Sequence, residues 1–292
     1  MSRPLLYTAI ATALLPGVWL MGAEPPSVPR TPAIIAHRGA SRDAPENTLA
    51  AVRLAWQRKA DAVEIDVHLS KDRRVVVLHD ATTRRTAGQG GKVADQTLAQ
   101  LRRLDVGQHK SAKWAGERIP TVEEVLATVP KGKRLFVEIK CSRAVLAPLA
   151  AALANSGLAA TQVEIIGFDL QTMTAAKKRL PNHPVHWLCA PKKHPATGQW
   201  KPSADEMLAK IRRAGLDGLD LAANPAIDKP FVQTIHAAGK KLYVWTVDDP
   251  AKARRLQAAG VDAITTNRPG HLRTQLGSAP PIPSRAQQTK PI

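Results

Sequence analysis

Cysteine and aromatic residues are scarce in this 292-residue chain, and each scarcity narrows what the protein can be. The two cysteines, Cys141 and Cys189, do not have the spacing of a zinc site. The aromatic content of 4% gives little support for a platform on which the bases of a single nucleic-acid strand would stack. Nucleic acid is therefore not expected as a partner.

Acidic residues are also few, because 24 Asp and Glu residues stand against 42 Lys and Arg residues and leave a formal net charge of +18. A surplus of this size favours anionic partners such as phosphate esters, nucleic acid or an anionic membrane surface. The positive charges are spread in ones and twos along the chain, which is typical of solvated faces. With nucleic acid set aside, phosphate esters and an anionic envelope surface are the partners that this charge favours.

Charged residues are missing from positions 5–23, where nineteen mostly apolar residues follow one another. This pattern predicts a secretory signal peptide over residues 1–23, cleaved near Ala23, and hence a periplasmic or secreted protein. An uncleaved membrane anchor is the alternative, because nineteen residues just suffice to span a bilayer. Pro16 and Gly17 favour cleavage, since they break a helix where a signal peptide ends.

The rest of the chain divides into three parts by composition. A Pro-rich linker occupies residues 24–32, a folded domain is expected over 33–274, and the tail 275–292 lacks an apolar period and is predicted to be disordered. The contents of 44% hydrophobic and 23% charged residues suit a sizeable core. Export permits a disulfide between the two cysteines, and two buried free thiols are the alternative.

Short β-branched runs alternate with segments of helical period along the domain. This alternation predicts a parallel sheet with helical crossovers. The nine runs that indicate strands are 33–36, 62–67, 74–78, 134–139, 163–168, 185–190, 218–221, 242–246 and 262–266. Eight parallel strands would close a (β/α)₈ barrel, the TIM barrel.

One of the nine runs must then be an exception. The link between the second and third runs is too short for a crossover helix, so these two should form an antiparallel hairpin. A turn centred between Lys71 and Asp72 would place His79 roughly opposite Glu64. We therefore expect an α/β fold, a TIM barrel with an excursion, about residues 68–120, inserted after the second strand and lying over the active-site end.

Charged residues on two of the barrel strands indicate a site. Glu64 and Asp66 share one face of the second strand, since alternate side chains point the same way. With no Lys or Arg between them, the two carboxylates repel each other, and a hard divalent cation bound to both would remove this repulsion. The alternative is that both side chains lie on a strand face exposed to solvent. Glu138 and Lys140 repeat the pattern in VEIK, either at a strand end that opens onto a site or as a structural ion pair.

Two imidazoles stand at strand ends. His37 follows the run 33–36, and His79 follows the run 74–78. A lone strand-end histidine is more often structural than catalytic, but in a barrel these two would converge at one rim. The ordinary pKa of imidazole suits general acid and base catalysis near neutral pH.

Taken together, these segments resemble a glycerophosphodiester phosphodiesterase over roughly residues 33–274. The segments that carry the resemblance, in order, are HRGASRDAPENT, EIDVHLSKDRRVVVLHD, LDVGQHKSAKWAGERIPTVEEVL, VEIK, YVWTV and GVDAITTNRP. The resemblance implies a TIM barrel with an excursion after its second strand. It also implies metal-dependent hydrolysis of glycerophosphodiesters to sn-glycerol 3-phosphate and an alcohol.

The resemblance implicates three groups of residues. One divalent cation, Ca²⁺ or Mg²⁺, would be bound by Glu64, Asp66 and Glu138. The catalytic acid and base would be His37 and His79. The phosphate and the substrate's polar head would be bound by Arg38, Lys140, Asn47 and Trp245.

Two positions differ from the family's pattern. Asn267 follows the last strand where the family often has Asp. His68 matches no functional position, so a supporting or structural role is expected for it.

Two other functions remain open. A lysophospholipase D or sphingomyelinase D type enzyme shares the fold, and an exposed apolar rim beside the site would favour it. A catalytically inactive secreted binding protein is the alternative from another class, although the presence of every site residue argues against it.

Overall fold

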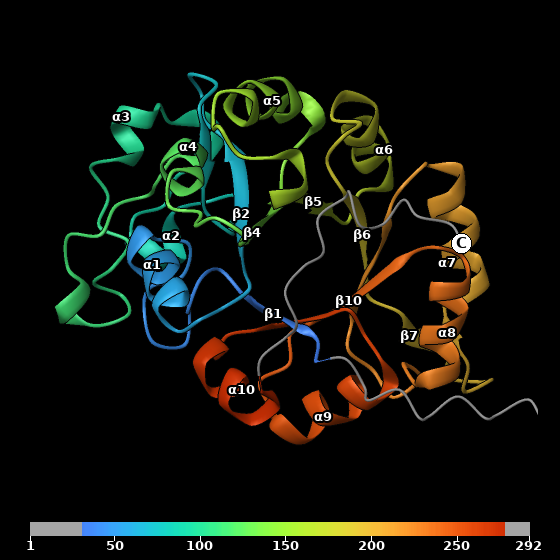
Figure 1. Ribbon diagram of the computed structural model, residues 1–292. Coiled ribbons are helices and arrows are strands. Elements are labelled where there is room, and N and C mark those ends of the chain that lie inside the picture. Colours follow the sequence, from blue (N-terminus) through green and yellow to red (C-terminus); the bar gives the residue numbers. More distant parts are fainter. Residues whose placement is uncertain (1–30, 278–292) are drawn as a thin grey trace, which may run out of the picture.

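The computed structural model describes residues 31–277 of the chain. Within them, eight parallel strands form a closed barrel surrounded by helices (Figure 1). The barrel strands are β1 (Ala33–Ala36), β2 (Ala62–Leu69), β4 (Arg134–Ile139), β5 (Val163–Gly167), β6 (Val185–Cys189), β9 (Gly218–Ala222), β10 (Lys241–Trp245) and β11 (Ala263–Thr266). The ring closes because β1 pairs in parallel with both β2 and β11. The predicted TIM barrel is confirmed.

The expected signal peptide, most of the linker and the tail beyond Gly277 lie outside the described residues.

Helices cover the outside of the barrel, and most begin at a side chain that caps the first turn, as Thr48 and Asp249 do. They are α1 (Leu49–Gln57), α4 (Val122–Leu126), α5 (Leu146–Ala154), α6 (Leu170–Arg179), α7 (Ala204–Arg213), α8 (Lys229–Ala237), α9 (Pro250–Ala259) and α10 (Pro269–Leu276). The sequence pattern did not predict α10, which ends two residues beyond the expected end of the domain at position 274. Among residues 31–277, no helix has the length and apolar character that crossing a bilayer requires.

A ninth strand, β3 (Val75–Val77), pairs antiparallel with β2 as predicted. The predicted register is wrong by one residue. Leu78 donates a hydrogen bond to the carbonyl of Asp66 at 3.0 Å, so His79 continues the hairpin one position away from a place opposite Glu64. The pairing of Val67 with Val77 and of Leu69 with Val75 centres the turn on Asp72, next to the left-handed φ of 62° at Arg73.

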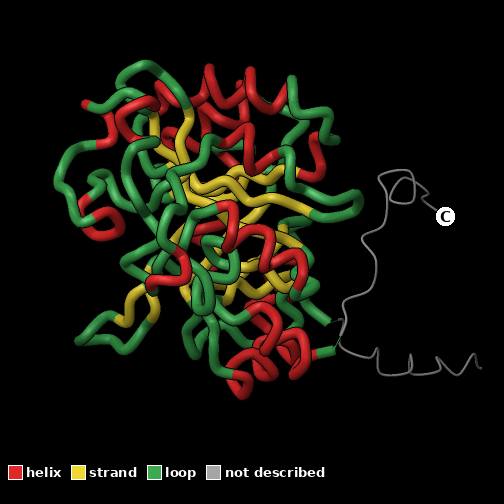
Figure 2. The backbone as a smooth tube through the Cα atoms, turned by 90° about the vertical axis from the view of Figure 1, so that its left-hand side faces the viewer, coloured by secondary structure: helices red, strands yellow, loops and turns green. Residues whose placement is uncertain are grey.

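The excursion between β3 and β4 contains α2 (Arg84–Ala87), α3 (Leu98–Leu101) and two short 3₁₀ turns, η1 (Val93–Asp95) and η2 (Ala112–Trp114). It occupies the left side of Figure 1 beside α1. Together with β3 it builds a small apolar cluster of its own, made of Val76, Leu78, Val93, Leu101, Leu104, Val106 and Ile119. A second addition, which the sequence did not predict, is the antiparallel hairpin of β7 (Lys192–Lys193) and β8 (Trp200–Lys201), which stands out from the body in Figure 2.

The inside of the barrel holds both apolar and ionic layers. Seven residues form the inner apolar cluster: Ile35, Ala62, Phe136, Ile166, Leu188, Tyr243 and Ala263. Glu164 is buried among them and pairs with Arg134 and with His186, whose Nε2 lies 2.8 Å from a carboxylate oxygen. Burial alone would raise the pKa of Glu164, but the Arg134 charge and His186 lower it to about 2. Cys141 and Cys189 are both free thiols.

Candidate active site

The C-terminal ends of the barrel strands surround a cavity of about 220 Å³. Barrel enzymes place their chemistry at this end. Its lining includes seven of the nine site residues expected from the sequence: His37, Arg38, Glu64, His79, Glu138, Lys140 and Trp245. The other two, Asp66 and Asn47, are buried behind this surface, where the Asn47 side chain donates to Asp66 Oδ2 at 2.8 Å. The structure thus brings all nine together.

Three carboxylates meet on the wall formed by β2 and β4. Oxygens of Glu64, Asp66 and Glu138 lie within 4.8 Å of one another, and all three residues are buried. The alternative of a solvated strand face is therefore wrong. Burial first, then the charges of the other two carboxylates, raises the pKa of Glu64 well above its ordinary value. Burial and the Asp66 charge raise the pKa of Glu138 to about 7.

These carboxylates have the chemistry of a site for a hard cation. Among the described residues, no side chain or backbone group donates a hydrogen bond to Glu64 Oε1 or Asp66 Oδ1, although both atoms are buried. Buried polar atoms without partners are rare in folded proteins and ask for an explanation. Oxygen donors that carry negative charge are what Ca²⁺ and Mg²⁺ prefer, so the residues fit a divalent ion.

Lys140 and Arg38 bring positive charge to the edge of this acidic cluster. The Lys140 ammonium lies 2.9 Å from Glu138 and 3.7 Å from Asp66, and it also lines the cavity, so it belongs to an ion pair and to the site at once. The Arg38 backbone N–H donates to Glu64 at 2.8 Å, and its guanidinium lies 3.3 Å from Asp66. Both cations can reach anionic groups of a ligand in the cavity.

The loop after β1 holds Arg38 and Asn47 in unusual backbone conformations. Arg38 has a φ of 53° and Asn47 a φ of 59°, both in the left-handed region that few residues other than glycine adopt. A hydrogen bond from the Asn47 N–H to the Arg38 carbonyl at 3.0 Å ties the two positions together. Backbone strain of this kind persists where the surrounding structure over-determines it, commonly at functional sites.

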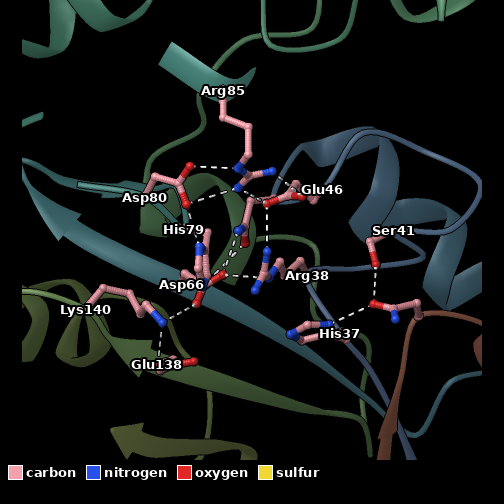
Figure 3. A network of polar contacts seen from close by, with 12 residues as sticks. His37, Arg38, Ser41, Glu46, Asp66, His79, Asp80, Arg85, Glu138 and Lys140 are labelled. Carbon is pink, nitrogen blue, oxygen red and sulfur yellow. Dashed lines mark hydrogen bonds and ion pairs between the residues drawn. The ribbon is translucent and has the colours of Figure 1, made fainter. Parts of the chain in front are cut away.

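An arginine from the excursion connects the two sides of the site. Arg85, on α2, donates to both oxygens of Glu46 at 2.9 and 2.7 Å, and to both oxygens of Asp80 at 2.7 and 3.2 Å (Figure 3). Glu46 in turn pairs with Arg38 at 3.0 Å, and Asp80 accepts from His79 Nδ1 at 2.7 Å. Burial alone would raise the pKa of Glu46, but hydrogen bonds from Arg85 and the Arg38 charge lower it to about 2. The sequence contained no signal for Arg85.

His79 is held from two directions. Its Nδ1 lies against Asp80, and the pKa of Asp80 is lowered to about 2, chiefly by the hydrogen bond from Arg85. The buried ring of His68 contacts the backbone carbonyl of His79 through Nε2 at 3.1 Å. His68 therefore has the supporting role that the sequence suggested.

His37 is held by a different kind of partner. Its Nδ1 lies 2.7 Å from the side-chain oxygen of Asn267, the position where the family often has Asp. Behind this amide stands the carboxylate of Asp248, which follows β10 and which sequence analysis overlooked. Burial and the Arg38 charge lower the pKa of His37, against smaller opposite effects of Asn267, Asp66 and Glu46.

Apolar side chains also line the cavity, namely Ile166, Phe168, Leu188 and Trp245. The Lys140 ammonium lies 5.8 Å from the centroid of the Phe168 ring. The Phe168 ring is 47% exposed and meets the Trp245 ring edge-on, with centroids 5.7 Å apart. The Trp245 indole donates to the Asp220 carbonyl at 3.1 Å, which fixes its orientation. A ligand in the cavity would therefore contact both charged groups and apolar side chains.

Comparisons with known proteins agree with this geometry. The Glycerophosphoryl diester phosphodiesterase family model matches residues 37–271. A glycerophosphodiester phosphodiesterase of Caldanaerobacter subterraneus subsp. tengcongensis is 35% identical over 242 residues, covering 81% of this chain and 94% of the relative. One of Bacillus subtilis (strain 168) is 30% identical over 254 residues, covering 80% and 83%.

A solved structure shows the same likeness in three dimensions. An Oleispira antarctica phosphodiesterase, in complex with the product sn-glycerol-3-phosphate, superimposes with a TM-score of 0.75 at 29% identity, covering 85% of this chain and 98% of that one. The family match extends over most of the described residues and includes the histidines, carboxylates and cations of the cavity. The chain therefore belongs to the glycerophosphoryl diester phosphodiesterase family.

Proposed function

We propose that this protein hydrolyses glycerophosphodiesters to sn-glycerol 3-phosphate and an alcohol. The observation that carries the proposal is a cavity lined by two imidazoles, two cations and two carboxylates of a buried triad. The volume of about 220 Å³ is below the range of roughly 300–1,000 Å³ typical of pockets for drug-sized ligands. It suits a small diester better than a whole lipid.

The carboxylates Glu64, Asp66 and Glu138 would hold one divalent cation, Ca²⁺ or Mg²⁺. When bound, such an ion neutralises charge on phosphoryl oxygens and positions the diester. Arg38 and Lys140 add fixed positive charge at the rim of the triad, where they would bind the remaining phosphoryl oxygens.

His37 is suited to accept a proton. A neutral amide faces its Nδ1, and burial lowers its pKa, so the ring is uncharged near neutral pH and its Nε2 is free to act as a base. The nucleophile that it would deprotonate is the substrate's own glycerol hydroxyl or water. A positioned base of this kind contributes about 10²–10⁴ to the rate.

His79 is suited to donate a proton. Its Nδ1 lies 2.7 Å from a carboxylate oxygen of Asp80, which orients the ring. The Nε2 proton would then pass to the oxygen of the departing alcohol. In this proposal the two histidines have opposite roles, with an amide facing His37 and a carboxylate facing His79.

Removal of either imidazole tests the proposal. We expect His37→Ala and His79→Ala each to lower kcat for glycerophosphocholine by about 10²-fold or more while circular dichroism shows an intact fold. The matched control is His109→Ala, because His109 is an exposed histidine of the excursion. Turnover near that of the wild type in either purified active-site variant would sink the assignment.

A second candidate function is hydrolysis of a lysolipid. The sequence pointed to an exposed apolar rim as the feature that would favour it, and Phe168 is such a rim residue. Phe168→Ala should then lower kcat/KM for 1-acyl-lysophosphatidylcholine about tenfold and leave glycerophosphocholine unchanged. An equal effect on both substrates, or no effect on either, would argue for the small diester alone.

We also propose that the enzyme acts outside the cytoplasm. The support is the uncharged apolar segment 5–23 with its small residues near Ala23. N-terminal sequencing of the mature protein from a cell-envelope fraction should find a chain that begins after Ala23. A protein recovered from that fraction with residues 1–23 still attached would support the anchor instead.

A further inference from the structure

The amide of Asn267 lies between an imidazole and a carboxylate. Its oxygen Oδ1 is 2.7 Å from His37 Nδ1, and its nitrogen Nδ2 donates to Asp248 Oδ2 at 2.8 Å. The Ser41 hydroxyl donates to the same Oδ1 at 3.0 Å (Figure 3). Each end of the amide therefore has a partner, and the partners at the two ends are chemically different.

Asp248 determines which way the amide points. An ionised carboxylate only accepts hydrogen bonds, so the atom of Asn267 that faces it must be the NH₂ group. Burial alone would raise the pKa of Asp248, but the hydrogen bonds from Asn267 and Thr266 lower it and keep the group ionised. The reversed amide would set its oxygen against the carboxylate and would be repelled.

The amide orientation in turn determines the tautomer of His37. An amide oxygen accepts and cannot donate, so the ring nitrogen that faces Asn267 Oδ1 must carry the proton. In the neutral ring the remaining nitrogen, Nε2, then has a free lone pair. In Figure 3 this second nitrogen points away from the Asn267 contact, toward the centre of the site.

The carboxylate itself is anchored by the barrel. Asp248 Oδ1 accepts from the Asn267 backbone N–H and from the Thr266 hydroxyl, both at 2.8 Å. Both donors lie at the end of β11, whereas Asp248 follows β10, and the two loops are further joined by Val247 N–H to the Thr265 carbonyl at 2.9 Å. Asp248 has no freedom to turn without breaking contacts to another strand.

We propose that Asp248 and Asn267 are positioning residues that hold His37 in the tautomer with its proton on Nδ1, so that Nε2 presents its lone pair to the cavity. The inference rests on the proposed function in one respect, namely that His37 is the base. The carboxylate acts through the amide and does not touch the imidazole. This separation gives the base a fixed tautomer without a negative charge directly on its ring.

Exchange of the two side chains provides the sharpest test. In Asp248→Asn the new amide nitrogen faces the Asn267 nitrogen, so Asn267 turns over and offers its NH₂ to His37. The imidazole must then accept at Nδ1 and carry its proton on Nε2. In the exchanged double variant D248N/N267D, the amide at 248 donates to the carboxylate at 267, which accepts from His37 Nδ1 and Ser41, so every hydrogen bond is again satisfied.

The readout is the tautomer of His37, measured by ¹⁵N NMR of the full chain labelled on histidine, with the His37 signal assigned from its loss in His37→Gln. We expect Asp248→Asn to move the proton from Nδ1 to Nε2 and to lower kcat about 10²-fold with little change in KM. We expect the double variant to restore the Nδ1 proton and to recover kcat to within about tenfold of the wild type. The pH–rate profile of the double variant should shift to higher pH, since a carboxylate then faces the His37 ring. The other charged groups near His37, which are Arg38, Asp66 and Glu46, are unchanged.

Asp249→Asn is the matched control. Asp249 is exposed and caps α9 by accepting a hydrogen bond from the Lys252 N–H. Its replacement by Asn removes the same charge as Asp248→Asn, one residue away. It should leave the tautomer and kcat unchanged. A wild-type tautomer in Asp248→Asn overturns the proposal, and so does a folded double variant with the proton on Nε2. If Asp248→Asn does not fold, the double variant alone decides. Because the tautomer is read without substrate, a protein inactive on glycerophosphodiesters would refute the proposed function and still report on this inference.

Discussion

The guanidinium of Arg85 and the carboxylate of Glu46 face each other through two hydrogen bonds, 2.7 and 2.9 Å long. The same guanidinium holds Asp80, so one side chain of the excursion fixes the partners of both Arg38 and His79. Paired hydrogen bonds of this kind define geometry as well as energy.

We therefore expect Arg85→Ala to lower kcat for glycerophosphocholine about tenfold, because Glu46 and Asp80 both lose their orientation. Arg85→Lys should rescue little, since a single ammonium cannot serve two carboxylates with paired bonds. Arg84→Ala, the neighbour on α2, is the control. Steady-state kinetics with unchanged kcat in Arg85→Ala would contradict the role given to this residue.

Asn47 combines a left-handed backbone with a side chain that holds Asp66, and two substitutions separate these features. Asn47→Gly and Asn47→Ala both remove the amide, so both should lose activity to the same extent. Only Ala is strained at a φ of 59°, so we expect it to be less stable than Gly by about 1 kcal/mol. Urea unfolding of the two purified variants measures the difference, and equal midpoints would show that the loop relaxes.

The raised pKa of Glu138 predicts how stability depends on pH without added metal. Its ordinary pKa is 4.5 and its folded pKa is about 7, so between these values the folded protein keeps a proton that the unfolded chain releases. The free energy of unfolding in the presence of chelator should therefore fall as pH rises from about 4.5 to about 7, by up to about 3 kcal/mol.

Added cation should reverse this trend, because a divalent ion binds the ionised carboxylates. At 100 times its Kd, Ca²⁺ or Mg²⁺ should stabilise the protein by about 2.7 kcal/mol near pH 7. Glu138→Gln should weaken the pH slope, leaving the part due to Glu64, and should lose the response to cation. Chemical denaturation at pH 5 and pH 7, with chelator and with each ion, measures both effects; a flat profile in the wild type would rule them out.

Glu164 supports the barrel from inside, where it neutralises Arg134 and lies 2.8 Å from His186 Nε2. Glu164→Gln leaves a buried guanidinium without its counter-charge, so we expect a loss of about 3–5 kcal/mol in the free energy of unfolding. Glu123→Gln, which breaks an exposed ion pair with Arg74, should cost less than about 1 kcal/mol. A similar small loss in both variants would mean that the inner ion pair adds little.

Much of the barrel was predictable because its strands alternate with helices and its charged residues break apolar runs at strand ends. His37, Glu64 and Glu138 were found in this way. The roles of Arg85 and Asp248 could not be predicted in this way. Each contacts residues of another loop, and only the closed barrel brings those loops together. His79, two residues beyond the end of β3, was placed one residue off for a similar reason, since the left-handed turn at Arg73 depends on local geometry and not on the strand pattern.

The excursion's separate apolar cluster has a consequence for the history and the engineering of this enzyme. A segment that brings its own core can change in length and sequence without disturbing the packing between barrel and helices. Beyond His79 and Asp80, its side-chain contacts with the catalytic end include those of Arg85 with Glu46 and Asp80 and that of the Lys110 ammonium with the Ser41 carbonyl. The excursion is therefore a place where new recognition elements can be grafted while the chemistry beneath it stays intact.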